Sequence, residues 1–180
     1  MKRFRKLLLA VAALVAALLL LAFVVGSLQP REHVAASHVE LRAEREAVWA
    51  VLADFATWPT WNHAFDAVEP APARDGKTVW LARGSYGDMP LVLERLEPPA
   101  RLTTFTPADA GLGFFGSWTY ELEERAGGGT RLRITERGEV PNPLFRFMMM
   151  LAGPTRTQRE FLRLLSTHLG EAQARITTES

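Results

Sequence analysis

The sequence predicts an α+β protein in which a curved antiparallel sheet wraps around a long C-terminal helix, with one transmembrane helix in front. Three observations support this fold class. An unbroken apolar run covers residues 7–25, short alternating segments follow between residues 66 and 140, and apolar residues recur at helical spacing between residues 161 and 172. We expect an anchor or signal peptide at 1–29, one domain at 30–174 and a tail at 175–180.

Length and composition limit the classes of protein to consider. The 180 residues suffice for one globular domain and a short extra segment. The chain has no cysteine, which excludes disulfides, thiolate metal sites and cysteine nucleophiles. Lys2, Arg3, Arg5 and Lys6 precede the apolar run, and the 17 basic and 20 acidic residues beyond residue 30 give that part a net charge of −3. A mildly acidic domain lacks the basic surface that nucleic acid requires, so we expect no nucleic-acid partner.

The N-terminal apolar run is long enough to cross a membrane. Leu7 to Val25 contains only Leu, Ala, Val and Phe, and as a helix it reaches about 28 Å, close to the hydrocarbon thickness of a bilayer. A cleaved signal peptide is the alternative, although its apolar region is usually about 7 to 15 residues. The preceding basic residues favour a cytoplasmic N-terminus. We therefore expect a single-pass protein of the inner (cytoplasmic) membrane with its domain on the periplasmic, extracytoplasmic side.

The domain begins with a strand and two helical segments. Apolar residues alternate with polar ones over residues 33–41, which predicts a strand. The next apolar residues recur at i, i+3, i+4 and i+7, as in a helix with one buried face: they are Val48, Val51, Leu52 and Phe55. Pro59 limits the following helical turn to residues 57–62, where Trp58 and Trp61 fall on one side.

A meander of up to six short strands is expected between Asp66 and Val140. Turn-forming pairs of glycine, aspartate and proline separate the segments. The clearest strands are residues 117–125 and 130–140, in which apolar and polar side chains alternate. One face of the sheet should therefore be apolar and the other solvated.

The C-terminal part predicts two helical pieces. Asn142 supplies an N-cap and Pro143 a first-turn proline, and an almost wholly apolar run follows at 144–151. Gly153-Pro154 should kink or break the helix. An amphipathic helix then follows, whose apolar stripe consists of Phe161, Leu164, Leu165, His168, Leu169 and Ala172.

Three segments carry a resemblance to a known family. They are Ala43, Val48-Trp49, Leu52, Asp54, Trp58 and Trp61-Asn62; the run Leu96-Glu97-Pro98-Pro99-Ala100-Arg101-Leu102; and Gly129-Thr130-Arg131 with Glu136-Arg137-Gly138-Glu139-Val140. Over about residues 34–172 the chain resembles the SRPBCC superfamily, the START-like group of polyketide cyclases, dehydrases and lipid-transport proteins. The resemblance implies the helix-grip fold and an internal pocket for a hydrophobic ligand. It leaves the activity open, because such a fold hosts many functions.

The candidate ligand-binding residues are the aromatic, flexible and polar side chains expected near that pocket. They are Trp58, Trp61, Phe105, Phe115, Trp118, Tyr120, Glu136, Phe147, Met148 and His168. Glu136 is in phase with Leu132 and Ile134, so its carboxylate is expected on the cavity side, where it would orient a ligand or act as a general acid or base. The structural alternatives are a salt bridge to an inward arginine or exposure at the end of the sheet. For His168 and Met148 the alternative is ordinary core packing.

Other chemistry is not indicated. The segment Gly111–Gly116 matches the dinucleotide-binding pattern GxGxxG in letters only, because a strand rather than a helix is expected after it. The four histidines show no metal-ligand spacing, and no serine-hydrolase or zinc-protease motif occurs. We therefore expect no metal and no cofactor.

Three functions stay open at this point. The first is a membrane-anchored domain that binds a lipid or another hydrophobic small molecule in an internal cavity. The second is a cyclase- or dehydratase-type enzyme that uses Glu136. The third is a non-catalytic domain whose cavity is filled by its own side chains and which docks at a membrane. The anchor is a departure from the soluble cyclases and favours work on lipids.

Overall fold

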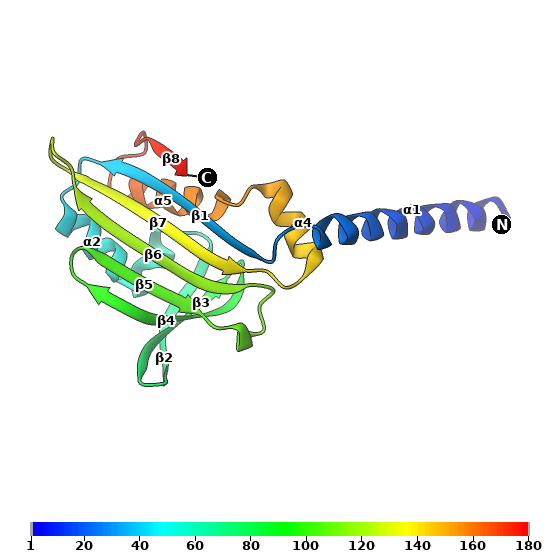
Figure 1. Ribbon diagram of the computed structural model, residues 1–180, viewed down its shortest axis with the longest axis horizontal. Helices are drawn as coiled ribbons and strands as arrows, with labels where there is room; N and C mark the ends of the chain where they lie inside the picture. The colour runs from blue at the N-terminus through cyan, green and yellow to red at the C-terminus, as the bar shows by residue number, and fades with distance from the viewer. Residues whose placement is uncertain (1, 180) are drawn as a thin grey trace.

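The computed structural model describes residues 2–179 as a sheet-and-helix domain from which one helix projects (Figure 1). The projecting helix is α1, Lys2–Ser27. Its apolar side chains are exposed along almost its whole length. By length and composition Arg3–Ser27 is able to cross a membrane, so α1 is compatible with the single-pass anchor that the sequence predicted.

The sheet has eight antiparallel strands in the order β2-β3-β4-β5-β6-β7-β1-β8. Their bounds are β1 Glu32–Leu41, β2 Phe65–Arg74, β3 Lys77–Gly84, β4 Gly87–Glu97, β5 Arg101–Thr106, β6 Phe115–Glu124, β7 Thr130–Glu139 and β8 Ile176–Glu179. Strands β2 to β7 form the predicted six-strand meander, and β1 adds to its end by pairing with β7. The expected α+β fold with a curved antiparallel sheet is confirmed.

The helices follow the predicted order with one difference at the C-terminus. They are α2 Arg45–Ala53, η1 Phe55–Thr57, α3 Trp58–Trp61, η2 Ala108–Ala110, α4 Pro143–Ala152 and α5 Arg156–His168. The Asn142 side chain caps α4 by accepting from the Leu144 amide at 2.9 Å, and Gly153, with φ +86°, ends it. Helix α5 stops before Ala172, because Gly170 takes φ +78° and the chain turns back to form β8, where the sequence had suggested a tail.

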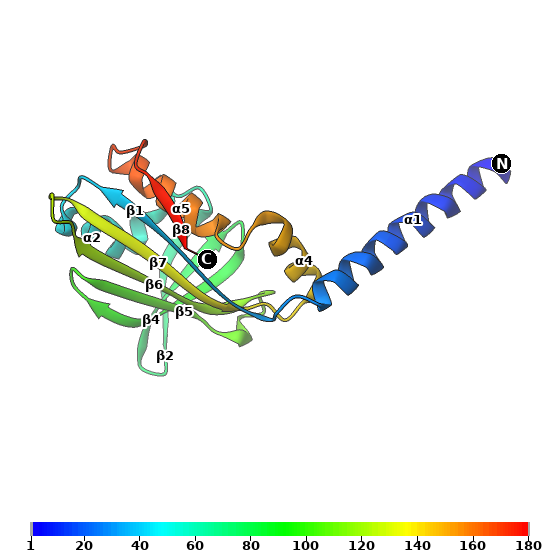
Figure 2. The same ribbon diagram turned by 45° about the horizontal axis from the view of Figure 1, so that its top comes forward.

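Strand alternation gives the sheet two different faces. On the concave face, Leu102, Tyr120, Leu122, Leu132 and Ile134 are buried against the helices. Figure 2 shows α5 lying across this part of the sheet, near β1 and β7. The core therefore lies between the sheet and the helices α2, α3 and α5.

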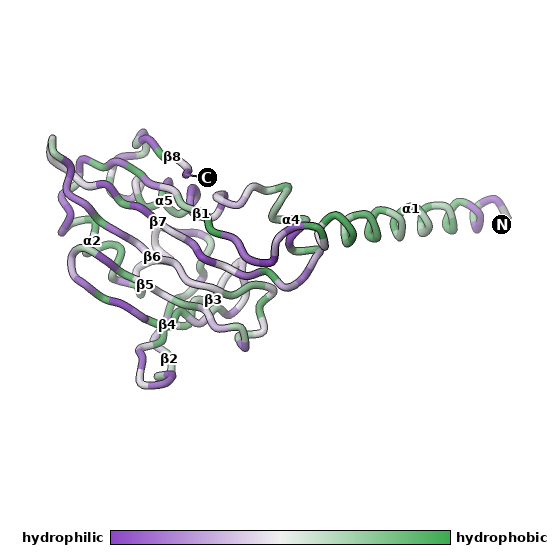
Figure 3. The backbone as a smooth tube through the Cα atoms, viewed as in Figure 1, coloured by the Kyte–Doolittle hydropathy of each residue, from purple (hydrophilic) through white to green (hydrophobic). Residues whose placement is uncertain are grey.

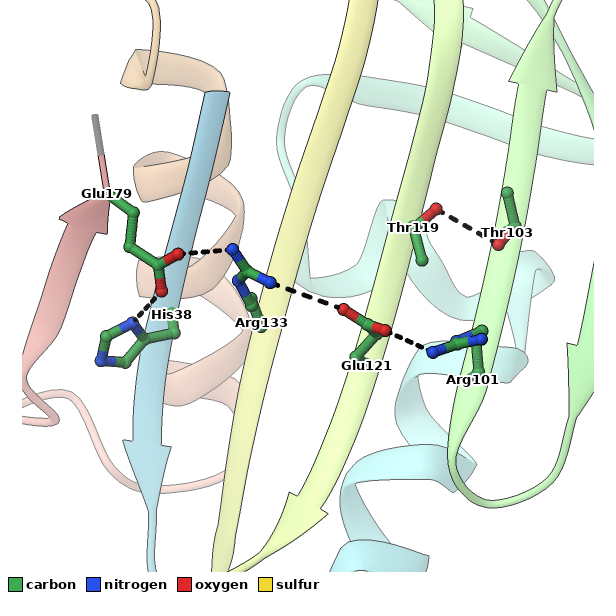
Figure 4. Close-up of polar contacts among 7 residues, drawn as sticks. All are labelled: His38, Arg101, Thr103, Thr119, Glu121, Arg133 and Glu179. Atoms are coloured by element: carbon green, nitrogen blue, oxygen red, sulfur yellow. Dashed lines mark hydrogen bonds and ion pairs between the residues drawn. The ribbon is translucent and has the colours of Figure 1, made fainter. Parts of the chain in front are cut away.

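The convex face carries a row of charged side chains (Figure 4). Glu179 on β8 accepts from Arg133 and lies 3.0 Å from His38 Nδ1, and Arg101 donates to Glu121 at 2.6 Å. Burial raises the pKa of Glu179, but its hydrogen bonds from Arg133 and His38 outweigh that effect and hold the pKa below its ordinary value. The contacts of Glu179 with Arg133 and His38 fasten the short strand β8 to the edge of the sheet.

Candidate functional site

A cluster of aromatic rings occupies the space between the sheet and α5. Trp58 lies at its centre, with ring centroids 4.8 Å from Phe55, 5.2 Å from Phe161 and 5.6 Å from Phe65. Its indole N–H donates to the Leu52 carbonyl at 3.1 Å, which fixes the ring through the end of α2. Each such ring pair adds about 0.5–1.5 kcal/mol beyond burial alone. The cluster holds α3, α5 and the sheet together.

The second tryptophan of α3 lies closer to the rim of this cluster. Trp61 contacts Phe161 edge-on at 5.2 Å and stacks on His168 at 6.0 Å between centroids. Trp61 itself is buried, whereas His168 is exposed at the last turn of α5. The indole Nε1 of Trp61 is buried and has no hydrogen-bond partner among the described residues.

A partly buried polar group lies beside the aromatic cluster, at the α4 end of α5. Glu136 Oε1 lies 2.9 Å from His33 Nε2, and its Oε2 accepts from Gln158 at 3.4 Å. Gln158 also donates to the Ala35 carbonyl at 3.0 Å, which joins α5 to β1. Glu136 thus points to the concave side, as its strand phase predicted, but its partner is a histidine rather than an arginine.

Several atoms of this group are left without a partner. Within residues 2–179, His33 Nδ1, Gln158 Oε1 and Ser37 Oγ are buried and make no hydrogen bond. Buried polar atoms in folded proteins are nearly always satisfied by protein, water or ligand. The concave side therefore presents hydrogen-bonding capacity that this chain does not use itself.

Two tyrosines lie near Glu136, Tyr120 in the interior and Tyr86 at the rim of the domain. Burial, together with the nearby charge of Glu136, raises the pKa of Tyr120. Burial also raises the pKa of Tyr86, which lies in the β3–β4 turn and is partly exposed. Both phenols are therefore neutral donors at physiological pH.

Aromatic side chains continue from the cluster to the end of the sheet near α4. The Phe114 ring meets Trp118 and Tyr86 edge-on, each at 6.4 Å. A Cβ on Gly113, in the same β5–β6 loop, would lie 2.8 Å from the Phe145 ring of α4. The glycine-rich segment is followed by strand β6 and not by a helix, so it lacks the setting of a dinucleotide-binding loop.

Two surface hollows within residues 2–179 lie elsewhere. One, of about 360 Å³, is lined by Glu40, Glu123, Glu124, Arg125, Ala126, Gly127 and Arg131. The other, of about 240 Å³, is lined by Glu97, Ala100, Arg101, Glu121, Leu122 and Glu123. Neither contains a ring of the cluster. Between sheet and α5, side chains fill the region where the resemblance implied an open pocket.

The structure brings some of the predicted site residues together and separates others. On the concave side lie Trp58, Trp61, Trp118, Tyr120 and Glu136, with His168 at the rim. Phe105 and Phe115 lie in the strand phase of Thr103 and Thr119, which faces the convex side. Phe147 and Met148 lie on α4, away from the cluster.

Sequence reasoning missed four members of the site: His33, Tyr86, Gln158 and Phe161. His33 is an even number of residues from Ser37 and Val39 on β1, so strand alternation predicts that all three face the same side of the sheet. Phe161 was assigned to a buried stripe without a role. Gln158 and Tyr86 carry no local signal, because only the folded chain places them near Glu136.

Solved structures share the fold at low sequence identity. The di-domain aromatase/cyclase BexL aligns with a TM-score of 0.62 at 13% identity over 84% of this chain, which spans only 53% of BexL. The Zhui aromatase/cyclase from Streptomyces gives 0.62 at 18% identity, covering 79% of this chain and 94% of that one. A START superfamily protein from Mycobacterium smegmatis gives 0.60 at 19%, covering 77% and 97%. These likenesses establish the fold alone.

A search of curated protein sequences finds no significant match. The sequence profile described as "Polyketide cyclase / dehydrase and lipid transport" matches residues 32–170, which is nearly all of the sheet-and-helix domain. The chain belongs to the polyketide cyclase/dehydrase and lipid transport family.

Proposed function

We propose that this protein binds a lipid or another hydrophobic small molecule on the concave side of its sheet while α1 holds it in a membrane. One observation carries the proposal: an aromatic cluster adjoins buried polar atoms that have no partner in the described chain. Apolar rings with a few convergent polar groups are the usual composition of a small-molecule site. The family to which the chain belongs supports the same ligand class.

The arrangement suggests how an amphiphilic molecule would be held. Its apolar part would replace ring contacts around Trp58 and Phe161, and each Å² removed from water would contribute about 25 cal/mol. Its polar end would pair with His33 Nδ1 or Gln158 Oε1. Burying an unpaired polar atom costs about 1–3 kcal/mol, so a headgroup that satisfies these atoms gains affinity.

Because the concave side is filled, binding requires helix α5 or its side chains to move. Gly153, with φ +86°, and Pro154 separate α5 from α4. A short glycine-containing link of this kind absorbs backbone rotation at low cost. We propose that α5 tilts from the sheet at this link, carrying Phe161 with it, when the ligand enters.

The membrane part of the proposal depends on α1. Its exposed apolar side chains include Leu7, Leu14 and Leu20, and the basic residues lie before them. Lysine and arginine flanks remain cytoplasmic. We propose that α1 crosses the inner membrane once and that the domain faces the extracytoplasmic side.

Tryptophan quenching by a brominated fatty acid tests the binding proposal. The full chain is placed in nanodiscs whose lipids carry no bromine. Its tryptophan fluorescence should fall when the brominated fatty acid is added, because Trp58, Trp61 and Trp118 lie on the concave side. Phe161→Leu should bind the probe more tightly, since less packing must be displaced. Phe105→Leu, a matched change on the convex face, should behave as wild type. Equal quenching of the two variants, or no quenching of wild type, would favour the docking function with a permanently filled interior.

A second function, acid–base catalysis, is favoured by one specific contact. The 2.9 Å approach of Glu136 to His33 Nε2 leaves Nδ1 unpartnered, the arrangement of a carboxylate-oriented general base. The molecules extracted from wild type and from Glu136→Gln distinguish the two functions. An enzyme would leave unreacted substrate of different mass in the variant, whereas a binding protein would yield the same compound from both.

A further inference from the structure

Helix α4 exposes apolar side chains that the domain does not cover. Met148 is 62% and Leu151 69% exposed, and Leu144, Phe145 and Met150 are exposed as well. The one charged residue of the helix, Arg146, is 5% exposed and points inward. Figure 3 shows the helix as a largely hydrophobic segment beside α1. A continuous apolar surface of this kind marks a site of contact with a membrane or another protein.

The exposed helix is packed against the end of α1. A Cβ on Gly26 would lie 1.9 Å from the Pro143 carbonyl oxygen and 3.3 Å from Cβ of Phe147, so the two helices meet through the bare backbone of a glycine. Gly26 follows directly on the apolar run that ends at Val25. Helix α4 therefore starts at the level where the membrane-spanning segment ends.

Arg146 fastens this junction. Its guanidinium donates from Nε to the Gly26 carbonyl at 2.8 Å, and from Nη1 to the Val140 and Pro141 carbonyls at 2.9 and 2.8 Å. The Gly26 carbonyl belongs to the last turn of α1, where a cation is favourable, and it also accepts from the Gln29 amide at 3.2 Å. A buried cation without a carboxylate partner thus fixes α4 relative to the anchor.

The direction of α4 suits a helix that lies in the plane of a membrane surface. Figures 1 and 2 both show α4 crossing the end of α1 instead of continuing its axis. If α1 crosses the bilayer, a helix that crosses its end lies along the interface. An apolar helix in that position embeds its exposed side chains at the boundary between headgroups and acyl chains.

We infer that α4 lies in the interface of the same bilayer that α1 crosses, so that the end of the sheet near Tyr86 and Phe114 faces lipid. The inference rests on the membrane anchoring proposed above. It deepens the proposed function, because Phe145 of α4 contacts the β5–β6 loop, whose Phe114 joins the aromatic side chains leading to the cluster. A lipid would enter the domain from the bilayer at this end without crossing water.

Single cysteines test this geometry, since the natural chain has none. The full chain carries Met148→Cys or Leu151→Cys, labelled with the environment-sensitive fluorophore NBD, in phosphatidylcholine/phosphatidylglycerol vesicles. Leu14→Cys in α1 reports on the anchor. Leu96→Cys is the matched control, an exposed leucine at the far end of β4. Circular dichroism confirms that each labelled chain is folded.

We expect blue-shifted emission and strong quenching by lipids brominated on their acyl chains at positions 148 and 151, as at position 14, and neither effect at 96. Quenching at 14 without quenching at 148 and 151 would overturn the inference and leave the anchor intact. Absence of quenching at 14 would overturn the anchor itself, and the inference with it. Disulfide crosslinking between two Met148→Cys chains, without lipid quenching, would assign the surface to a second copy and also overturn the inference.

Discussion

Helices α4 and α5 follow one another along the chain, and they treat their apolar residues differently: α5 has few and buries them in the domain, whereas α4 is mostly apolar and leaves many exposed. In α5 the apolar residues form one stripe, in which Leu162 and Leu165 are fully buried, and charged residues such as Arg159 occupy the other side. In α4 apolar residues occupy nearly every side, and Met148 and Leu151 remain exposed. A single apolar stripe therefore lets a helix bury all its apolar residues in the core of the domain. A helix that is apolar on nearly every side has apolar surface left over, which the domain does not cover.

The largest expected difference between the two helices is in folding stability. Leu162→Ala in α5 should lower the free energy of unfolding by about 2–5 kcal/mol, because it leaves a cavity in the core. Met148→Ala in α4 should change it by less than about 0.5 kcal/mol, as for other exposed sites. Denaturant unfolding of the full chain in detergent measures both. Equal losses would mean that α4 packs as α5 does.

The junction of α4 with α1 should be the next most sensitive feature. Arg146→Met removes the side-chain donor of the Gly26, Val140 and Pro141 carbonyls, and within residues 2–179 only the Gly26 carbonyl keeps a backbone partner, the Gln29 amide at 3.2 Å. The cost is about 1–3 kcal/mol, as for a buried unsatisfied group. Hydrogen exchange of residues 28–32 should become faster. Arg159→Met, at an exposed position of α5, is the control and should leave this exchange unchanged.

Substitutions at two glycines test how closely α1 and α4 pack. Gly26→Ala forces a Cβ against the Pro143 backbone and should destabilise the α1–α4 contact by about 1–3 kcal/mol. Gly127→Ala adds a Cβ with nothing within 4 Å and is the matched control. The distribution of distances between spin labels on α1 and on the domain should broaden only in Gly26→Ala. The same distances in both variants would contradict a close helix contact.

The smallest expected effect concerns the strand that follows α5. Glu179→Gln should weaken the docking of β8 by about 0.2–1 kcal/mol, the range for exposed ion pairs. The lowered pKa of Glu179 sets the sign: its contribution is complete above the pKa of the unfolded state and is lost as the pH falls through the folded-state value. Weaker docking of β8 should appear as faster hydrogen exchange of the Thr177 and Thr178 amides, with Glu123→Gln as the control. Exchange independent of pH and of residue 179 would contradict the assignment.

Much of the fold was predictable because its signals are local. The six-strand meander follows from alternation and turn residues, and the break between α4 and α5 follows from Gly153 and Pro154. Strand β8 was not predictable, because four residues are too short for periodicity and its pairing partner β1 lies far away in sequence.

The site was predictable only in part. Trp58, Trp61 and Glu136 were placed by helical spacing and strand phase, which depend on neighbours in the sequence. His33 and Gln158 join Glu136 through contacts between β1, β7 and α5, which no local pattern encodes. Phe147 and Met148 were expected near a ligand because they are apolar, but the contact of α4 with α1 places them outside the domain core.

Native mass spectrometry of the full chain, released from nanodiscs made with natural membrane lipid and followed by extraction of any bound compound, tests ligand binding on the concave side of the sheet. We expect one apolar or amphiphilic molecule per chain that survives release, and we expect it to be lost or exchanged when Gln158 and His33 are replaced by Leu. A bare protein mass, persisting after loading with membrane lipid extract, would contradict ligand binding on the concave side.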